Sequence, residues 1–281
     1  MNASEAEVQR VVRQADPERY LSALYAPAEL RGSLLALYAF NAELAAVRDR
    51  IREPLPGEIR LQWWRDALSS LDDPAAEAGH PVAAALIETI RRHKLPVEPF
   101  QNMIEARVFD LYDDPMPSRG DLEGYSGETA SALIQLSALI LDPQAAVVTA
   151  DLAGHAGCAQ AIAGILRMLP IHRRRGQSYI PLDVLAAAGA TRDTFIEGTD
   201  REAAARAVEA MVALGREHLA AFTEGAGALP VSLRPAYLPL ALTGAYFDRI
   251  QSLADKALDE SASLPPWRRH WLLLKHAKGG W

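Results

Sequence analysis

Apolar residues recur every three or four positions through most of the chain. This is the period of a helix with one buried face. The clearest example is a stripe that begins at Leu30 and ends at Ile51, and its members are Leu30, Leu34, Leu37, Phe40, Leu44, Val47 and Ile51. No segment shows the strict alternation of apolar and polar residues that is typical of a strand. The pattern therefore predicts an all-α protein.

Proline, glycine and capping residues divide this pattern into separate helices. Two prolines and a glycine in Glu53–Gly57 are expected to end the first long helix. Long helices rich in small residues are predicted over 121–141 and 144–168, and a helical run with an internal kink at Pro239 is predicted over 232–258. No linker or repeat appears, so residues 1–281 are predicted to form one helical-bundle domain.

Composition and charge exclude several classes of protein. The chain has 281 residues, a net charge of −7 and a single cysteine, Cys158. The negative charge argues against a general nucleic-acid binder, and one cysteine excludes an internal disulfide or a multi-thiolate zinc site. Cys158 and His155 lie on one predicted helix, and both side chains are expected to be buried in the protein core. The acidic N-terminus does not resemble a secretory or transit peptide, so we expect a cytoplasmic protein.

The stretch Gly164–Pro181 changes from an apolar helix to a basic turn. Arginines at 173–175 precede Gly176, and Ser-Tyr-Ile-Pro follows. This stretch resembles the second signature of the squalene/phytoene synthase family, in which Asn-x-x-Arg-Asp-x-x-Glu-Asp precedes Arg-Gly-Arg-x-Tyr-Leu-Pro. Anchored on Arg167, the register continues without a gap to Tyr179 and Pro181. The acids of the signature are replaced, and the residues in their places are Met168, Ile171 and His172.

The first signature of that family also has a counterpart. Tyr38–Asn41 resembles the run that leads into the family's Asp-Asp-x-x-Asp motif, whose aspartates fall on Ala45, Ala46 and Asp49. The resemblance implies an isoprenoid synthase fold in which the helix of Asp49 packs beside the helix of Cys158–Met168. In the family, acids of both signatures hold the Mg²⁺ ions that promote ionisation of prenyl diphosphates. Only Asp49 remains of six acids, so no metal site is expected.

One branch of the family is more similar to this chain than the others. This branch assists the assembly of respiratory complex I and likewise lacks the acids, and the similar runs are 39–45, 57–64 and 179–183. The resemblance implies a non-catalytic assembly factor for NADH dehydrogenase, with a complex I subunit or assembly intermediate as partner at the inner membrane and no cofactor. Two alternatives stay open: a head-to-head prenyltransferase that uses Mg²⁺, and a prenyl-lipid binding protein.

Five residues of the second signature are candidates for binding a diphosphate or another anion. Guanidinium groups match phosphate oxygens in shape and charge, and the candidates are Arg167, Arg173, Arg174, Arg175 and Tyr179. The alternative is an arginine run that is merely solvated on an exposed turn.

Trp63, Trp64 and Arg65 are candidates for a surface that contacts a protein partner. Trp and Arg are enriched at the energetic centres of interfaces. Neighbouring side chains point about 100° apart on a helix, so the two indoles cannot both enter the core by the same face. The alternative is that Glu53–Gly57 covers both.

The end of the chain combines tryptophans with bases. Between Ser261 and Trp281 there is no acid, and the bases are Arg268, Arg269, Lys275 and Lys278. A helix is predicted over 267–278. Because aromatic and basic residues are typical of helices that lie on anionic membranes, Trp267, Trp271 and Trp281 are predicted to contact a membrane surface. The alternative is a helix that docks on the bundle through Trp267, Trp271 and Leu274.

Overall fold

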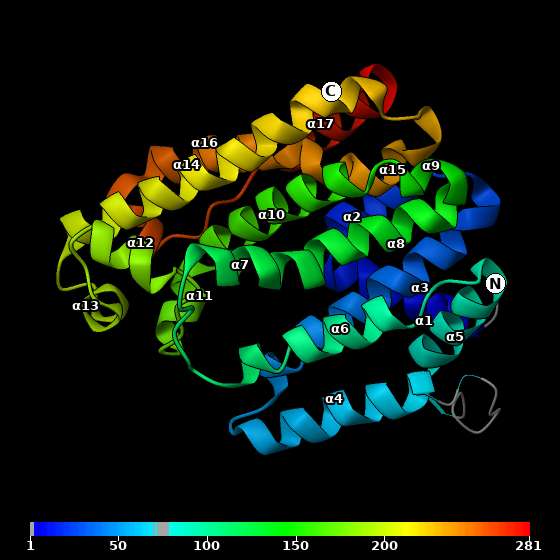
Figure 1. Ribbon diagram of the computed structural model, residues 1–281, viewed down its shortest axis with the longest axis horizontal. Helices are drawn as coiled ribbons and strands as arrows, with labels where there is room; N and C mark the ends of the chain where they lie inside the picture. The colour runs from blue at the N-terminus through cyan, green and yellow to red at the C-terminus, as the bar shows by residue number, and fades with distance from the viewer. Residues whose placement is uncertain (1–2, 70, 72–78) are drawn as a thin grey trace. The chain divides into compact units, whose positions relative to one another are not determined.

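The computed structural model describes residues 3–69, 71 and 79–281, and these residues form helices joined by short turns (Figure 1). No strand occurs in these ranges. The prediction of an all-α protein is therefore confirmed. Asp72 and Asp73, which the sequence suggests as a solvated helix end, lie outside the described residues.

The chain divides into two compact units. The first comprises Met1–Tyr112, Ala132–Ala150 and Pro230–Leu238, and the second comprises Asp113–Ser131, Asp151–Leu229 and Pro239–Trp281. Each unit is thus assembled from three separate pieces of the sequence. That the whole chain acts as a single domain stays a prediction.

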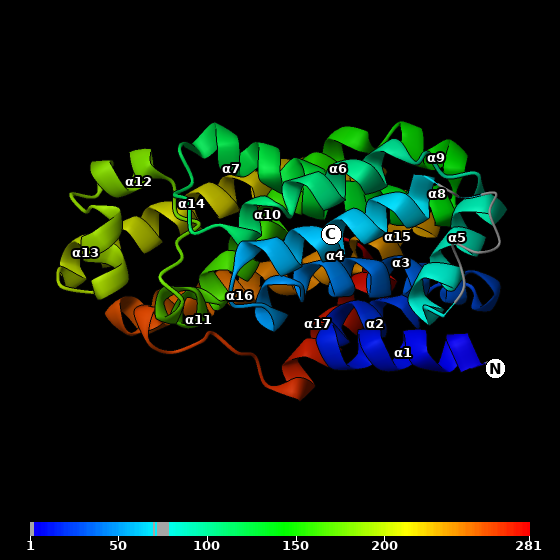
Figure 2. The ribbon, with the colours of Figure 1, turned by 90° about the horizontal axis from the view of Figure 1, so that it is seen from below.

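The first unit is built around α3. Its helices are α1 (Ala3–Ala15), α2 (Pro17–Ala23), α3 (Ala28–Ala45), α4 (Pro54–Ser69), α5 (Pro81–His93), α6 (Glu98–Ala106), α8 (Ala132–Leu141), α9 (Pro143–Val147) and α15 (Arg234–Tyr237), with short 3-10 turns at Arg48–Arg50, Phe109–Leu111 and Val231–Leu233. Helices α1, α2, α5 and α8 pack against α3, and Figure 2 shows α1 running along it. The predicted stripe lies inside, since Leu34, Leu37 and Phe40 are completely buried.

The end of α3 differs from the prediction. The helix ends at Ala45, and a 3-10 turn, η1 (Arg48–Arg50), follows before Ile51. The residues Pro54, Pro56 and Gly57, which were expected to form a loop, instead make the first turn of α4. A proline is tolerated there because the first N–H groups of a helix have no partner inside it. The break therefore lies earlier, and the prolines begin a helix.

The second unit surrounds the long helix α14. Its helices are α7 (Arg119–Ser126), α10 (Ala150–Arg167), α11 (Leu169–Arg174), α12 (Leu182–Ala187), α13 (Arg192–Glu197), α14 (Arg201–Gly225), α16 (Thr243–Leu253) and α17 (Pro266–Gly279), with short turns at Ala226–Ala228 and Ala254–Leu258. Helices α12 and α16 pack against α14, and Figure 1 shows α16 beside it. The Asp200 side chain caps α14 by accepting from the Ala203 N–H.

Three predicted long helices are interrupted. The 121–141 run contains a π-helical turn, η4 (Gly127–Ser131), between α7 and α8. The 144–168 run becomes α9, which Asp142 caps, and α10, and the break between them lies at Val148 and Thr149. Pro239 lies in a 3-10 segment, η7 (Leu238–Leu242), between α15 and α16. Pro239 lacks the N–H that a continuing helix would use.

A close approach of backbones fixes α10 against the π turn. A Cβ built on Gly157 would lie 2.3 Å from the Ser131 backbone nitrogen and 2.4 Å from its Cα. In addition, the Ser131 hydroxyl donates to the Gly154 carbonyl oxygen at 3.0 Å. Only glycine fits at position 157 in this arrangement.

We expect Gly157→Ala to lower the free energy of unfolding by about 1–3 kcal/mol, because the added methyl group meets backbone that cannot move aside. Denaturant unfolding followed by circular dichroism measures the change. Gly164→Ala on the same helix is the control, since no atom lies within 4 Å of its Cβ position, and alanine there is expected to stabilise by up to about 1 kcal/mol. Equal stability of both variants would contradict the close-approach argument.

Candidate functional site

The first signature segment lies at the end of α3 and in the turn after it. Ala45 is exposed at the last position of α3, and Asp49 is exposed in η1 between two arginines. Asp49 therefore lies beyond the helix on which the sequence placed it. Neither Ala45 nor Ala46 has a side-chain atom that can bind a metal.

Glu43 is the carboxylate that this segment buries. Its side chain is 10% exposed, and Arg50 donates to it from Nη1 at 2.9 Å and from Nη2 at 3.4 Å. Arg60 of α4 donates from Nη2 to the same carboxylate at 3.3 Å. A buried carboxylate between two guanidinium groups is electrostatically satisfied. The acid thus joins the end of α3 to η1 and α4.

His80 extends this cluster toward the start of α5. Its Nδ1 accepts from the Ala83 N–H at 3.3 Å and thereby caps the helix. Burial and the nearby Arg60 charge lower the pKa of His80. The imidazole therefore stays neutral at physiological pH, and the rings of Trp63 and Trp64 pack around it at 4.8 and 5.2 Å.

The two tryptophans of α4 have different surroundings. Trp64 is completely buried and meets the edge of Phe40 at 5.1 Å, so its predicted place in a partner surface is wrong. Trp63 is half-buried, and Arg65 pairs with Glu105. Two further apolar residues of α4 face outward, because Leu55 and Ile59 are 63% and 64% exposed. Leu55 was not among the residues predicted for this surface.

The second signature segment supports the fold of the second unit. Arg173 donates to the carbonyl oxygens of Phe195, Ile196 and Leu258 at 2.8–3.1 Å and to the Asp259 carboxylate at 3.1 Å. All three guanidinium nitrogens take part. Arg173 therefore has a structural role in this unit, and diphosphate binding by it stays a prediction.

The other candidate anion ligands have different surroundings. The Arg167 guanidinium lies over the Tyr246 ring at 3.7 Å. Tyr179 is buried, and its hydroxyl accepts from Gln177 Nε2 at 3.1 Å. Arg174 is exposed and Arg175 is half-buried. Anion binding by these residues stays a prediction, as does the packing of the Asp49 segment beside α10.

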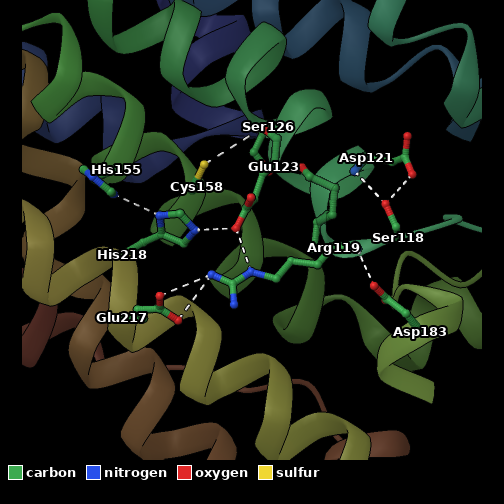
Figure 3. Close-up of polar contacts among 11 residues, drawn as sticks. Ser118, Arg119, Asp121, Glu123, Ser126, His155, Cys158, Asp183, Glu217 and His218 are labelled. Atoms are coloured by element: carbon green, nitrogen blue, oxygen red, sulfur yellow. Dashed lines mark hydrogen bonds and ion pairs between the residues drawn. The ribbon is translucent and has the colours of Figure 1, made fainter. Parts of the chain in front are cut away.

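Three helices of the second unit share a polar cluster that the sequence did not indicate (Figure 3). Arg119 of α7 donates from Nε to Glu123 at 2.8 Å and from Nη2 to Glu217 of α14 at 3.3 Å. Glu123 also contacts His218 of α14 at 3.2 Å, between Oε1 and Nε2. Burial opposes ionisation of Glu123, but hydrogen bonds from Arg119 and His218 outweigh it, so the pKa of this carboxyl is lowered.

His155 and Cys158 lie one helical turn apart on α10, beside the same cluster. His155 is exposed, which corrects its predicted place in the interior, and its Nδ1 lies 3.0 Å from Nδ1 of His218. Cys158 is buried as predicted. Burial and the Glu123 charge raise the pKa of its thiol to about 11, so it is not a nucleophile at neutral pH.

The C-terminal helix α17 exposes its aromatic residues. Trp267 and Trp271 are 71% and 56% exposed, and Leu274 is 43% exposed, whereas Leu273 is buried. The predicted docking through Trp267, Trp271 and Leu274 is therefore wrong. Trp281 is half-buried and packs edge-on against Phe222 at 5.2 Å, and its contact with a membrane stays a prediction. None of the described helices is long and apolar enough to cross a membrane.

Comparisons with known proteins identify the family to which this helical fold belongs. Residues 12–271 match the family described as squalene/phytoene synthase. The chain belongs to this family. It is 31% identical over 246 residues to complex I assembly factor 6 of Bos taurus, covering 86% of this chain and 72% of that protein.

Two further matches extend the comparison. The chain is 24% identical over 266 residues to phytoene synthase of Arthrospira platensis, covering 89% of this chain and 84% of that protein. The crystal structure of a squalene synthase from Alicyclobacillus acidocaldarius superposes with a TM-score of 0.74 at 21% identity, over 92% of this chain and 95% of that one. The isoprenoid synthase fold is therefore confirmed.

The residues at the two family signatures do not fit a magnesium cluster. Mg²⁺ requires oxygen ligands, and the corresponding positions hold Ala45, Ala46, Met168, Ile171 and His172 beside a single acid. Throughout the part of the chain that the structure describes, no group of three or more His, Cys, Asp or Glu residues could hold a metal ion. The family's metal-dependent chemistry has no counterpart in this donor set.

We expect Glu43→Ala to destabilise the protein by about 1–2 kcal/mol, because hydrogen bonds to a buried charged group are lost while two solvated arginines remain. Thermal and denaturant unfolding provide the measurement. Glu105→Ala is the matched control, because Glu105 is 71% exposed and also pairs with an arginine. The control should cost less than about 1 kcal/mol. A Glu43 variant as stable as the control would show that the cluster does not hold α3 to α4.

Proposed function

We propose that this protein is a non-catalytic member of the squalene/phytoene synthase family that assists the assembly of respiratory complex I. The observation that carries the proposal is the loss of metal ligands at both signatures, where only Asp49 remains and lies exposed between Arg48 and Arg50. The similarity to complex I assembly factor 6 over most of the chain supports the same conclusion.

The chemistry of the family explains why these losses matter. Departure of diphosphate from a prenyl chain leaves a highly charged anion beside a carbocation, and metal ions must neutralise that anion. Glu43 is the buried acid of the first signature segment, and Arg50 and Arg60 already neutralise its charge. A protein with this donor set keeps the fold and loses the reaction.

Helix α4 is the proposed surface for a protein partner. Leu55, Ile59 and the half-buried Trp63 lie four residues apart and present apolar area on one side of the helix, and Arg65 follows on the same helix. Exposed apolar residues that gather on one element are typical of interaction sites. The partner on this proposal is a complex I subunit or an assembly intermediate.

Deletion of the gene in the organism that carries it should lower the amount of assembled complex I. Native gel electrophoresis and NADH oxidation by isolated membranes measure this. The wild-type gene should restore assembly, and Ile59→Asp should restore it by less than half, because a charge replaces exposed apolar area. Val148→Asp, at a position 81% exposed on another part of the surface, is the control and should restore assembly fully.

The enzyme hypothesis is checked with the purified protein. Incubation with farnesyl or geranylgeranyl diphosphate and Mg²⁺ should release no pyrophosphate above the background of a boiled sample. Release that a chelator abolishes would identify a prenyltransferase and overturn the proposal. Prenyl lipid that remains bound after gel filtration, without release, would support the lipid-binding alternative instead.

We also propose that α17 lies on the cytoplasmic face of the inner membrane. Trp267, Trp271 and Leu274 follow one another at spacings of four and three, so they share one face of the helix, and all three are exposed. The segment from 261 to 281 carries four bases and no acid. Anionic lipids attract such bases, and indole rings favour the membrane interface.

Co-sedimentation with vesicles that contain anionic phosphatidylglycerol, at low salt, tests the role of α17. The double variant Trp267→Ala/Trp271→Ala should reduce the bound fraction severalfold, since both exposed indoles are lost. The control Val147→Ala/Val148→Ala removes exposed apolar groups elsewhere, 69% and 81% exposed, and should bind normally. Equal binding of both double variants, or no binding by the wild type, would exclude this surface.

A further inference from the structure

The imidazoles of His155 and His218 face each other through the same type of nitrogen. Their Nδ1 atoms lie 3.0 Å apart, and their ring centroids are 5.3 Å apart. His155 comes from α10 and His218 from α14. In the metal-free protein one of these nitrogens must carry the proton that lies between them.

Glu123 determines which ring nitrogen of His218 keeps a free lone pair. Its Oε1 lies 3.2 Å from Nε2 of His218, so this Nε2 carries a proton and donates it. The remaining nitrogen, Nδ1, then has its lone pair directed at His155. Figure 3 shows the His218 ring between the Glu123 carboxylate and His155. A carboxylate that orients an imidazole from behind is the usual outer shell of a histidine metal ligand.

The separation of the two nitrogens suits one bound ion. Two Zn–N bonds of about 2.0–2.1 Å at a tetrahedral angle span about 3.3 Å. The observed 3.0 Å is near this span, but the centroid separation of 5.3 Å shows that the two rings point head-on at each other. To share one ion, the exposed His155 side chain must therefore turn until its Nδ1 lone pair meets that of His218 at an angle. An ion at this point replaces the shared proton.

The surrounding charges favour a cation. The groups beside the pair are Glu123 and Glu217, which are acidic, and Arg119, whose guanidinium is already occupied by those two carboxylates. His218 has a side chain only 12% exposed, whereas His155 is exposed to solvent. One ligand is thus held rigidly, and water can reach the other.

We propose that His155 and His218 bind a divalent transition-metal ion such as Zn²⁺ or Ni²⁺, with both Nδ1 atoms as ligands and Glu123 as the outer-shell carboxylate. Water completes the coordination, because the protein supplies two ligands. Imidazole suits these ions, whereas Mg²⁺ prefers oxygen. The ion joins α10 to α14 and has no part in the family's prenyl chemistry.

Isothermal titration calorimetry of the full chain without a histidine tag tests the site, with ZnCl₂, NiCl₂ and MgCl₂ as separate probes. We expect one Zn²⁺ ion per chain in the first titration, one Ni²⁺ ion per chain in the second, and no heat of binding when MgCl₂ is added. Loss of an outer-shell partner weakens metal binding by about 10- to 100-fold. His155→Ala and His218→Ala each remove a ligand and should therefore weaken binding by more than this. Glu123→Gln should weaken it by about 10-fold.

His270→Ala is the matched control, because His270 is exposed on α17 and hydrogen-bonds only to the Pro266 carbonyl oxygen in the contacts described. Its affinity for Zn²⁺ should equal that of the wild type. His155→Ala replaces an exposed side chain, so its fold should be preserved, and a circular dichroism spectrum checks this. Absence of wild-type binding at 1 mM Zn²⁺, roughly the weakest affinity of interest, or unchanged binding by His155→Ala, would show that the pair forms a hydrogen bond only.

Discussion

A buried carboxylate with two arginine partners organises the first signature segment. Glu43 cannot be buried alone, because an isolated charge in the interior is strongly disfavoured. Arg50 reaches it only because the chain turns back in η1 after α3 ends, and Arg60 reaches it only because α4 begins with its prolines in the first turn. This ion pair therefore depends on the early end of α3, on the turn and on the position of α4.

The same use of arginine appears in the second unit. Arg173 satisfies three carbonyl oxygens, and Arg192 donates to the carbonyl oxygens of Asp113 and Gly176 at 2.7 and 2.8 Å. The oxygens of Phe195 and Ile196 lie in the last turn of α13, that of Leu258 ends a 3-10 turn, and those of Asp113 and Gly176 lie in non-helical segments. Positive charges that suggested anion binding thus stabilise irregular backbone. The two signatures have in common that charged groups hold the protein's own chain.

The sequence predicted the fold more fully than the site. Periodicity located the buried stripe of α3, because that signal is local. The interruption at Ser131 was missed, since it depends on contact with Gly157, which is distant in sequence. For the same reason the pairing of His155 with His218 left no signal. The outward position of Ile59 could not be predicted, because helical spacing alone does not say which of two apolar faces is covered.

The division of the chain bears on how the protein folds during synthesis. The chain passes between the two units five times, at residues 112, 131, 150, 229 and 238. Helix α15, the last piece of the first unit, packs against α2 and α8, so this unit cannot close until more than four-fifths of the chain has left the ribosome. Contacts so distant in sequence slow folding. The N-terminal helices must therefore persist as an incomplete core, with apolar surface exposed, for most of translation.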